Sequence, residues 1–218
     1  MQDKKLLLEY MESFQPKNHT LFRDMESFAE QDKVPIMEKD ALEVMLQLLQ
    51  LHNSRRILEI GTAIGYSALR MAQALPQAHI VSLEKDEIRH KQALNYRELS
   101  GLQTHTTFYL TDALEESFSL ESTEAFDVLF IDAAKGKYLE FFEKYTPYVK
   151  RNGLVITDNV FFKGLTATPE KASKRLLPMV QKIRTFNQML AETPSYQTRF
   201  LPVGDGLAVS MKVENDTR

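Results

Sequence analysis

The sequence predicts a doubly wound α/β fold, and three observations lead to that prediction. From Arg56 onward, short apolar runs alternate with helical patterns. Continuous apolar runs are typical of strands buried on both faces, and strand–helix–strand units require right-handed crossovers and therefore a parallel sheet. Near the C-terminus, two further runs flank a glycine-containing turn with no helix between them. We therefore expect a parallel sheet covered by helices that ends in an antiparallel hairpin.

The individual elements follow from these patterns. The expected parallel strands are Ile57–Ile60, His79–Leu83, Thr107–Leu110, Phe126–Ile131 and Leu154–Thr157. Helices are expected over Ser67–Leu75, over Glu87–Leu99 with Gly101 closing it, and over Lys137–Val149. Thr168 and Pro169 suit the N-cap and first position of a further helix that runs towards Leu190, with a kink or break at Pro178. Tyr196–Leu201 and Leu207–Val213 flank Pro202–Gly206 and form the expected hairpin.

We interpret residues 1–218 as one domain, because no repeat or Gly/Ser linker divides the chain. Residues 1–34 are expected to be a helical extension and 35–218 the core. In the extension, an apolar stripe at helical spacing precedes Pro16: Leu7, Tyr10, Met11 and Phe14. A second stripe lies between Pro35 and His52: Leu42, Met45, Leu46 and Leu49. The first stripe either caps a site or packs against a second subunit, and we favour a homodimer.

Composition excludes several classes of protein. Lys and Arg number 27 against 30 Asp and Glu, so the net charge of −3 does not indicate a nucleic-acid binder, although a local basic patch stays open. The chain has no cysteine, which excludes disulfides and thiolate metal sites. No apolar run approaches the roughly 20 residues of a membrane helix, and the N-terminus lacks the pattern of a signal peptide. We therefore expect a cytoplasmic protein without a membrane partner.

Candidate site residues follow the predicted strands, because ligands bind beyond the carboxyl ends of parallel strands. The groups found there are Gly61–Ser67, Glu84, Asp112-Ala113, Asp132–Lys135 and Asp158-Asn159. The first is a G-x-x-x-G loop with Ala63 where a dinucleotide fingerprint has its second glycine, which disfavours a close pyrophosphate. Glu84, about 20 residues on, suits the hydroxyls of an adenosine ribose. Alternatively, the loop is only a tight turn and Glu84 a solvated carboxylate.

Asp132, Asp158 and Asn159 are expected to converge as three oxygen ligands at the ends of neighbouring strands. A hard divalent ion such as Mg²⁺ takes carboxylate and amide oxygens and keeps positions for water or substrate. The alternative is that Asp158-Asn159 merely opens a loop through Asx-turn bonding. The five histidines lack metal-ligand spacing. Lys135 adds a basic group beside the three oxygen ligands.

The segments ILEIGTAIGYSALRMA, VSLEKD, FIDAAK and LVITDN, within a match from Val34 to the C-terminus, resemble the catechol/caffeoyl-CoA type of Mg²⁺-dependent, S-adenosylmethionine-dependent O-methyltransferase. The resemblance implies a class I, Rossmann-like, seven-stranded methyltransferase sheet. It also implies that Asp132, Asp158 and Asn159 bind the metal and that Lys135 is the general base, with Asp132 as a further catalytic and cofactor-binding residue. The cofactor positions that it implies are Met37 through its backbone, Gly61 and Ser67 at the methionine moiety, Glu84 at the ribose, and Asp112 and Ala113 at the adenine edge.

Within that family, FIDAAKGKY followed by TDNVFFKG most resembles a bacterial branch that methylates 5-hydroxyuridine at the tRNA wobble position to 5-methoxyuridine. The alternative acceptor is a small catechol-like or phenylpropanoid compound, which also offers two adjacent oxygens to one metal. Phosphate contacts to tRNA would come from basic residues that otherwise form a solvated helix face: Lys163, Lys171, Lys174, Arg175, Lys182 and Arg184. An NAD-type oxidoreductase and a non-enzymatic adenosine-binding module are further alternatives.

Overall fold

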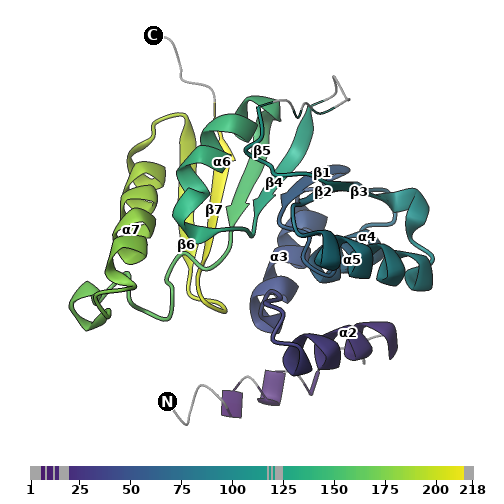
Figure 1. The fold of residues 1–218 in the computed structure, drawn as a ribbon. Helices are drawn as coiled ribbons and strands as arrows, with labels where there is room; N and C mark the ends of the chain where they lie inside the picture. The colour runs from purple at the N-terminus through teal and green to yellow at the C-terminus, as the bar shows by residue number, and fades with distance from the viewer. Residues whose placement is uncertain are drawn as a thin grey trace.

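The expected α/β architecture is confirmed. The computed structural model describes residues 6–7, 9–11, 13–14, 20–116, 118, 120 and 125–213. A central sheet carries helices on both faces (Figure 1). Its strands are β1 (Arg56–Ile60), β2 (His79–Glu84), β3 (Thr106–Leu110), β4 (Phe126–Ile131), β5 (Val149–Thr157), β6 (Tyr196–Leu201) and β7 (Leu207–Lys212). The α-helices are α2 (Thr20–Gln31), α3 (Lys39–Leu51), α4 (Tyr66–Ala74), α5 (Glu87–Ser100), α6 (Tyr138–Tyr145) and α7 (Leu177–Glu192).

The strand order places the candidate site. The sheet runs β3-β2-β1-β4-β5-β7-β6. Strands β1 to β5 pair in parallel, whereas β7 pairs antiparallel with both β5 and β6. The order reverses between β1 and β4, so the loops that follow these two strands leave in different directions and open a crevice between them.

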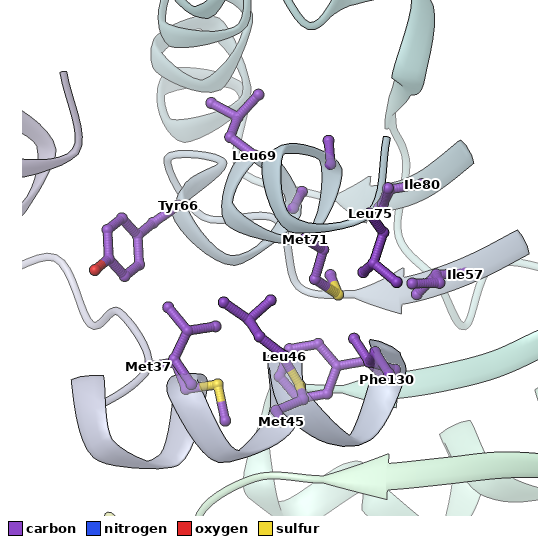
Figure 2. Close-up of a cluster of buried hydrophobic side chains, with 14 of the residues drawn as sticks. Met37, Met45, Leu46, Ile57, Tyr66, Leu69, Met71, Leu75, Ile80 and Phe130 are labelled. Carbon is purple, nitrogen blue, oxygen red and sulfur yellow. The ribbon is translucent and has the colours of Figure 1, made fainter. Parts of the chain in front are cut away.

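Two apolar cores lie on opposite faces of the sheet. Successive residues of each buried strand alternate between them, as the pleat requires: Ile57 packs into one core and Leu58 into the other. Helices α2 to α5 cover the first face (Figure 1), and Figure 2 shows Met45 and Leu46 of α3 facing Met71 of α4 within that core. Helices α6 and α7 cover the second face. Since both faces are covered, the continuous apolar runs in the sequence are explained.

Three helical expectations need correction. The helix expected to start at Thr168 is a short 3₁₀ turn at Pro169–Lys171, and no side-chain cap bond is made by Thr168. The long helix begins at Leu177, so Pro178 lies in its first turn, where a missing N–H costs nothing, and does not kink it. The helix expected over Lys137–Val149 ends at Tyr145, and a 3₁₀ turn with Pro147 follows.

The N-terminal region contains one element that was not among those expected. Helix α2 buries Phe22, Met25 and Ala29 in the same core as α3 and α4, although most of its residues are polar. In the earlier stripe, Leu7, Tyr10 and Met11 are helical and Phe14 lies in a turn, and all four side chains are exposed. Pro16 lies outside the described residues. The division at residue 34 therefore stays a prediction.

Candidate functional site

A cavity of about 500 Å³ opens beyond the carboxyl ends of β1 to β5. The strand ends bring eight of the predicted site residues to its wall: Gly61, Glu84, Asp112, Ala113, Asp132, Lys135, Asp158 and Asn159. The segment between α2 and α3 closes one side with Pro35, Ile36 and Glu38. Because the wall combines apolar side chains with a few acidic groups, the cavity has the character of a small-molecule site.

Two predicted cofactor residues do not line this cavity. The Met37 side chain is buried in the core that Figure 2 shows, while its neighbours Ile36 and Glu38 reach the cavity wall. Because the prediction concerned the backbone near Met37, these neighbours keep that stretch beside the cavity. Ser67 is also buried, and its hydroxyl donates a hydrogen bond to the Glu59 carboxylate.

Gly61 brings the glycine loop against the neighbouring strand end. Its φ is +105°, a conformation that glycine adopts without the steric cost of a Cβ. A Cβ built there would lie 2.0 Å from the Asp132 carbonyl oxygen. The amides of Gly61 and Thr62 both donate to the Leu83 carbonyl, at 3.0 and 3.2 Å. Glycine is therefore required because the backbones after β1 and β4 are in contact.

Glu84 holds the same loop from β2. Its buried carboxylate accepts hydrogen bonds from the amides of Ala63 (2.7 Å), Lys85 (3.0 Å) and Asp86 (2.9 Å). An ionised carboxylate has about four acceptor positions, so these three donors leave capacity for one more. The reading of Glu84 as a solvated carboxylate is wrong, because this side chain is only 7% exposed.

Asp132 and Asp158 are neighbours at the ends of adjacent strands. The Asp132 amide donates to the Ile60 carbonyl at 3.0 Å, and the Asp158 amide donates to the Ile131 carbonyl at 3.1 Å. Asn159 follows with a φ of +57°, and its amide and its side-chain Nδ2 donate to the two oxygens of Asp158 at 2.7 and 3.1 Å. The Asp158 carboxylate accepts the amide of the next residue, whereas the Val160 amide donates to Gly206, so these bonds are not those of an Asx turn. Asp132, Asp158 and Asn159 all line the cavity.

The two acidic side chains at the strand ends both have raised pKa values. Burial raises the pKa of Asp132 to about 6, against the opposing effect of nearby Lys135. Burial and the charge of Asp132 raise the pKa of Asp158 well above its usual value. Lys135 Nζ donates to the Asn159 Oδ1. A bound cation would relieve the repulsion between the carboxylates.

The donor set fits a hard divalent ion, since two carboxylates and an amide oxygen are ligands that Mg²⁺ accepts. Among the residues that the structure describes, no three His, Cys, Asp or Glu side chains are grouped to hold a metal. Asp132 and Asp158 make a set of three oxygen donors only together with the side-chain amide of Asn159. None of the described histidines lines the cavity.

Glu59 is a residue that the search of strand ends missed. It lies inside β1, fully buried, and accepts hydrogen bonds from the hydroxyls of Ser67 and Ser82. Burial raises the pKa of Glu59 to about 7 despite these bonds, and the nearby charges of Asp132 and Glu84 add to the rise. The signal was present in the sequence, because an acidic residue in the middle of a buried apolar run needs an explanation.

The six basic residues predicted to contact phosphates do not line the cavity. They are exposed and belong to the loop after β5 or to α7: Lys163, Lys171, Lys174, Arg175, Lys182 and Arg184. Lys182 Nζ donates to the Gly136 carbonyl at 3.4 Å, so α7 contacts the loop that carries Lys135. Arg184 donates to the Thr166 carbonyl.

The structure describes no helix long and apolar enough to cross a membrane.

Known proteins resemble this chain over most of its length. The sequence is 30% identical over 175 residues to a caffeoyl-CoA O-methyltransferase of Eucalyptus gunnii, covering 77% of this chain and 70% of that protein. A Staphylococcus aureus structure provisionally named as a caffeoyl-CoA O-methyltransferase is 35% identical, with a TM-score of 0.88, and covers 97% of this chain and 100% of that one.

A third comparison concerns the fold alone. The O-methyltransferase of Bacillus cereus in complex with SAH has a TM-score of 0.81 and 24% identity, with 94% of this chain and 96% of that one covered.

The sequence profile described as O-methyltransferase matches residues 12–213. This match spans every described strand and helix from α2 to β7. The chain therefore belongs to the O-methyltransferase family.

Proposed function

We propose that this O-methyltransferase transfers a methyl group from S-adenosylmethionine to an acceptor hydroxyl, with Mg²⁺ held by Asp132, Asp158 and Asn159. One observation carries the proposal: the buried Asp158 carboxylate, the half-buried Asp132 carboxylate, the Asn159 amide oxygen and the Lys135 ammonium all line one cavity. The raised pKa values of Asp132 and Asp158 support a cation there, because a positive charge would stabilise both ionised forms.

The remaining cavity residues would bind the donor. Gly61 offers a close backbone approach, and Glu84 has acceptor capacity left for a ribose hydroxyl. Asp112 and Ala113 would contact the adenine edge, and the backbone near Met37 would close over the cofactor. Ser67 would act at the methionine moiety in the company of Glu59, to which its hydroxyl is bonded. These roles are expectations from the family resemblance, and Gly61, Glu84, Asp112 and Ala113 line the cavity, whereas Met37 and Ser67 do not.

The chemistry is an in-line displacement: the acceptor oxygen forms a bond to the methyl carbon while the carbon–sulfur bond breaks and S-adenosylhomocysteine leaves. When bound, Mg²⁺ would lower the pKa of the acceptor hydroxyl and orient it. Lys135, anchored by Asn159, would receive the hydroxyl proton at Nζ in its neutral form. Asp132 would help to hold the metal, and its carboxylate interacts with the charge of Lys135. Positioning of oxygen against methyl supplies much of the rate.

The first acceptor candidate is a small catechol-like or phenylpropanoid compound. The Eucalyptus relative, a caffeoyl-CoA O-methyltransferase, supports this class. Two adjacent oxygens on such a molecule would suit a site with one bound metal and Lys135 as the proton acceptor.

The second candidate is 5-hydroxyuridine at the wobble position of tRNA, whose 5-hydroxyl lies next to the C4 carbonyl oxygen. The observation that favours it is the basic face around α7, which reaches the Lys135 loop through Lys182. Phosphate contacts from such a face would position a polyanionic acceptor.

We propose further that two copies of the chain pair through the exposed stripe with Leu7, Tyr10, Met11 and Phe14. Sedimentation of the wild type and of Leu7→Glu would test this.

The decisive experiment offers both acceptors in parallel. The protein is incubated with methyl-labelled S-adenosylmethionine and either a catechol or tRNA that carries 5-hydroxyuridine, with Mg²⁺ or with EDTA. If one of the two acceptors becomes labelled in the presence of Mg²⁺ but not in EDTA, the result supports the mechanism and identifies the acceptor class. Lys135→Met should abolish transfer, whereas Lys150→Met, whose partner Asp127 lies at the opposite end of the sheet, should not. Full activity in EDTA would contradict the metal proposal.

Replacing Lys171, Lys174 and Arg175 together by Gln separates the two acceptors further. These exposed side chains lie outside the cavity. Transfer to tRNA should fall at least tenfold through KM, while transfer to a catechol should stay unchanged.

A further inference from the structure

The turn between β6 and β7, residues 202–206, lies alongside the loop that follows Asp158 and Asn159. The antiparallel pairing of β5 with β7 continues beyond the strand ends. The Val160 amide donates to the Gly206 carbonyl at 3.0 Å, and the Phe161 amide donates to the Asp205 carbonyl at 2.9 Å. The Asp205 carboxylate also accepts the amide of Lys163. The loop thus donates three hydrogen bonds to the turn, and Asp205 accepts two of them.

The loop that this turn binds has an unfavourable backbone. Asn159, Phe162 and Lys163 have φ values of +57°, +44° and +57°. Non-glycine residues in this region cost on the order of 1–3 kcal/mol each, and they persist only where the surroundings impose them. The Asp205 carboxylate accepts from the last of the three. It is therefore placed to keep the loop from relaxing towards ordinary dihedral angles.

The turn is itself anchored on two sides. Gly206 has a φ of +92°, and a Cβ there would lie 2.5 Å from the Phe161 ring, so the ring packs directly on the glycine backbone. On the other side, the Gly204 amide donates to Asp40 Oδ2 at 3.0 Å, at the start of α3. A Cβ at Gly204 would lie 2.8 Å from that of Ala41. The turn therefore packs between α3 and the loop and is held in place by contacts with both.

We propose that Asp205 is a positioning residue for the metal site: by holding the Lys163 amide, it fixes the loop that presents Asp158 and Asn159. Asp205 does not line the cavity, so it acts from outside it, through the loop backbone and through the interaction of its charge with Asp158. The inference rests on the proposed binding of a divalent ion by these residues. Partners that orient metal ligands typically change affinity 10- to 100-fold when removed. A loss of that order is expected for Asp205→Ala.

The test measures Mn²⁺ binding directly, by the loss of the free-ion electron paramagnetic resonance signal, without turnover. Asp205→Asn keeps an oxygen acceptor at the same reach but removes the charge. Asp205→Glu keeps the charge but moves the acceptor by one methylene. We expect the Mn²⁺ dissociation constant to rise at least tenfold in Asp205→Ala and Asp205→Glu and to stay within threefold in Asp205→Asn. S-adenosylmethionine affinity should stay unchanged in all three.

The matched control is Asp127→Ala. Asp127 also accepts two backbone amides, from Arg55 and Arg56, but at the opposite end of the sheet, so its removal should lower the melting temperature and leave Mn²⁺ affinity intact. If Asp205→Ala fails to fold, the Asn and Glu variants decide. Unchanged affinity in folded Asp205→Glu, or a tenfold loss in Asp205→Asn, overturns the inference. If the wild type itself binds no Mn²⁺, the proposed metal site is wrong and the inference falls with it.

Discussion

Replacing Gly61 by alanine tests whether the contact between the loops after β1 and β4 builds the site. The new Cβ would lie 2.0 Å from the Asp132 carbonyl oxygen, whereas real Cβ contacts essentially never fall below 3.0 Å. The two loops must therefore separate by about 1 Å. Because Asp132 moves with its carbonyl, a proposed metal ligand is displaced by a similar amount. A misplacement of that size near reacting groups costs on the order of 100-fold in rate.

Gly101 supplies the matched control. Its φ of +70° also lies in the left-handed region, but a Cβ there meets nothing within 4 Å. Gly101→Ala should therefore lose only the conformational cost, about 1–2 kcal/mol of unfolding free energy. Gly61→Ala adds overpacking of about 1–3 kcal/mol to a similar conformational cost.

Urea unfolding and methyl-transfer kinetics measure the two effects. We expect kcat/KM to fall at least 100-fold in Gly61→Ala and by less than threefold in Gly101→Ala. Equal kcat/KM values in the two variants would refute the reasoning, since the clash with Asp132 would then have no effect on the site.

Three further predictions follow from the buried charges. The pKa of Glu59 is about 7 in the folded state and 4.5 ordinarily, so the folded state holds the proton more tightly and its stability falls as the pH rises through that window. In urea unfolding, Glu59→Gln should therefore gain stability relative to wild type between pH 5 and pH 8, by up to about 3 kcal/mol. A difference in stability that does not change with pH would contradict this prediction. Millimolar Mg²⁺ should raise the melting temperature of the wild type and of Asp127→Ala but not of Asp158→Ala, because only a folded site binds the ion; an equal rise in Asp158→Ala would contradict the ligand set. Tyr66→Phe removes the hydroxyl that donates to Glu26 at 2.6 Å and accepts from Arg70 at 3.2 Å, so the free energy of unfolding should fall by about 1–3 kcal/mol. Lys39 forms a half-exposed ion pair with the same Glu26, and Lys39→Met should change the free energy of unfolding by at most about 1 kcal/mol.

Much of the fold was predictable because its signals are local. Five buried strands appear as apolar runs, and all five were found to within a few residues, except that β5 begins at Val149 rather than Leu154. Its earlier residues, such as Lys150 and Arg151, are exposed and charged, so they lack the apolar signal. The start of α7 was misplaced because Thr168-Pro169 is an equally good local start, which is used here for a 3₁₀ turn.

The sequence by itself determined the fold class and the set of strand-end residues, because apolar periodicity and position after a strand are properties of neighbouring residues. It could not determine which of these groups share one cavity. Only the tertiary structure brought Ser67 to Glu59, α7 to the Lys135 loop, and Asp205 to the loop after Asn159. Asp205 and Lys163, for example, are 42 positions apart, and their contact exists only because β7 inserts between β5 and β6. Contacts of this kind depend on strand order, which no local pattern in the chain encodes.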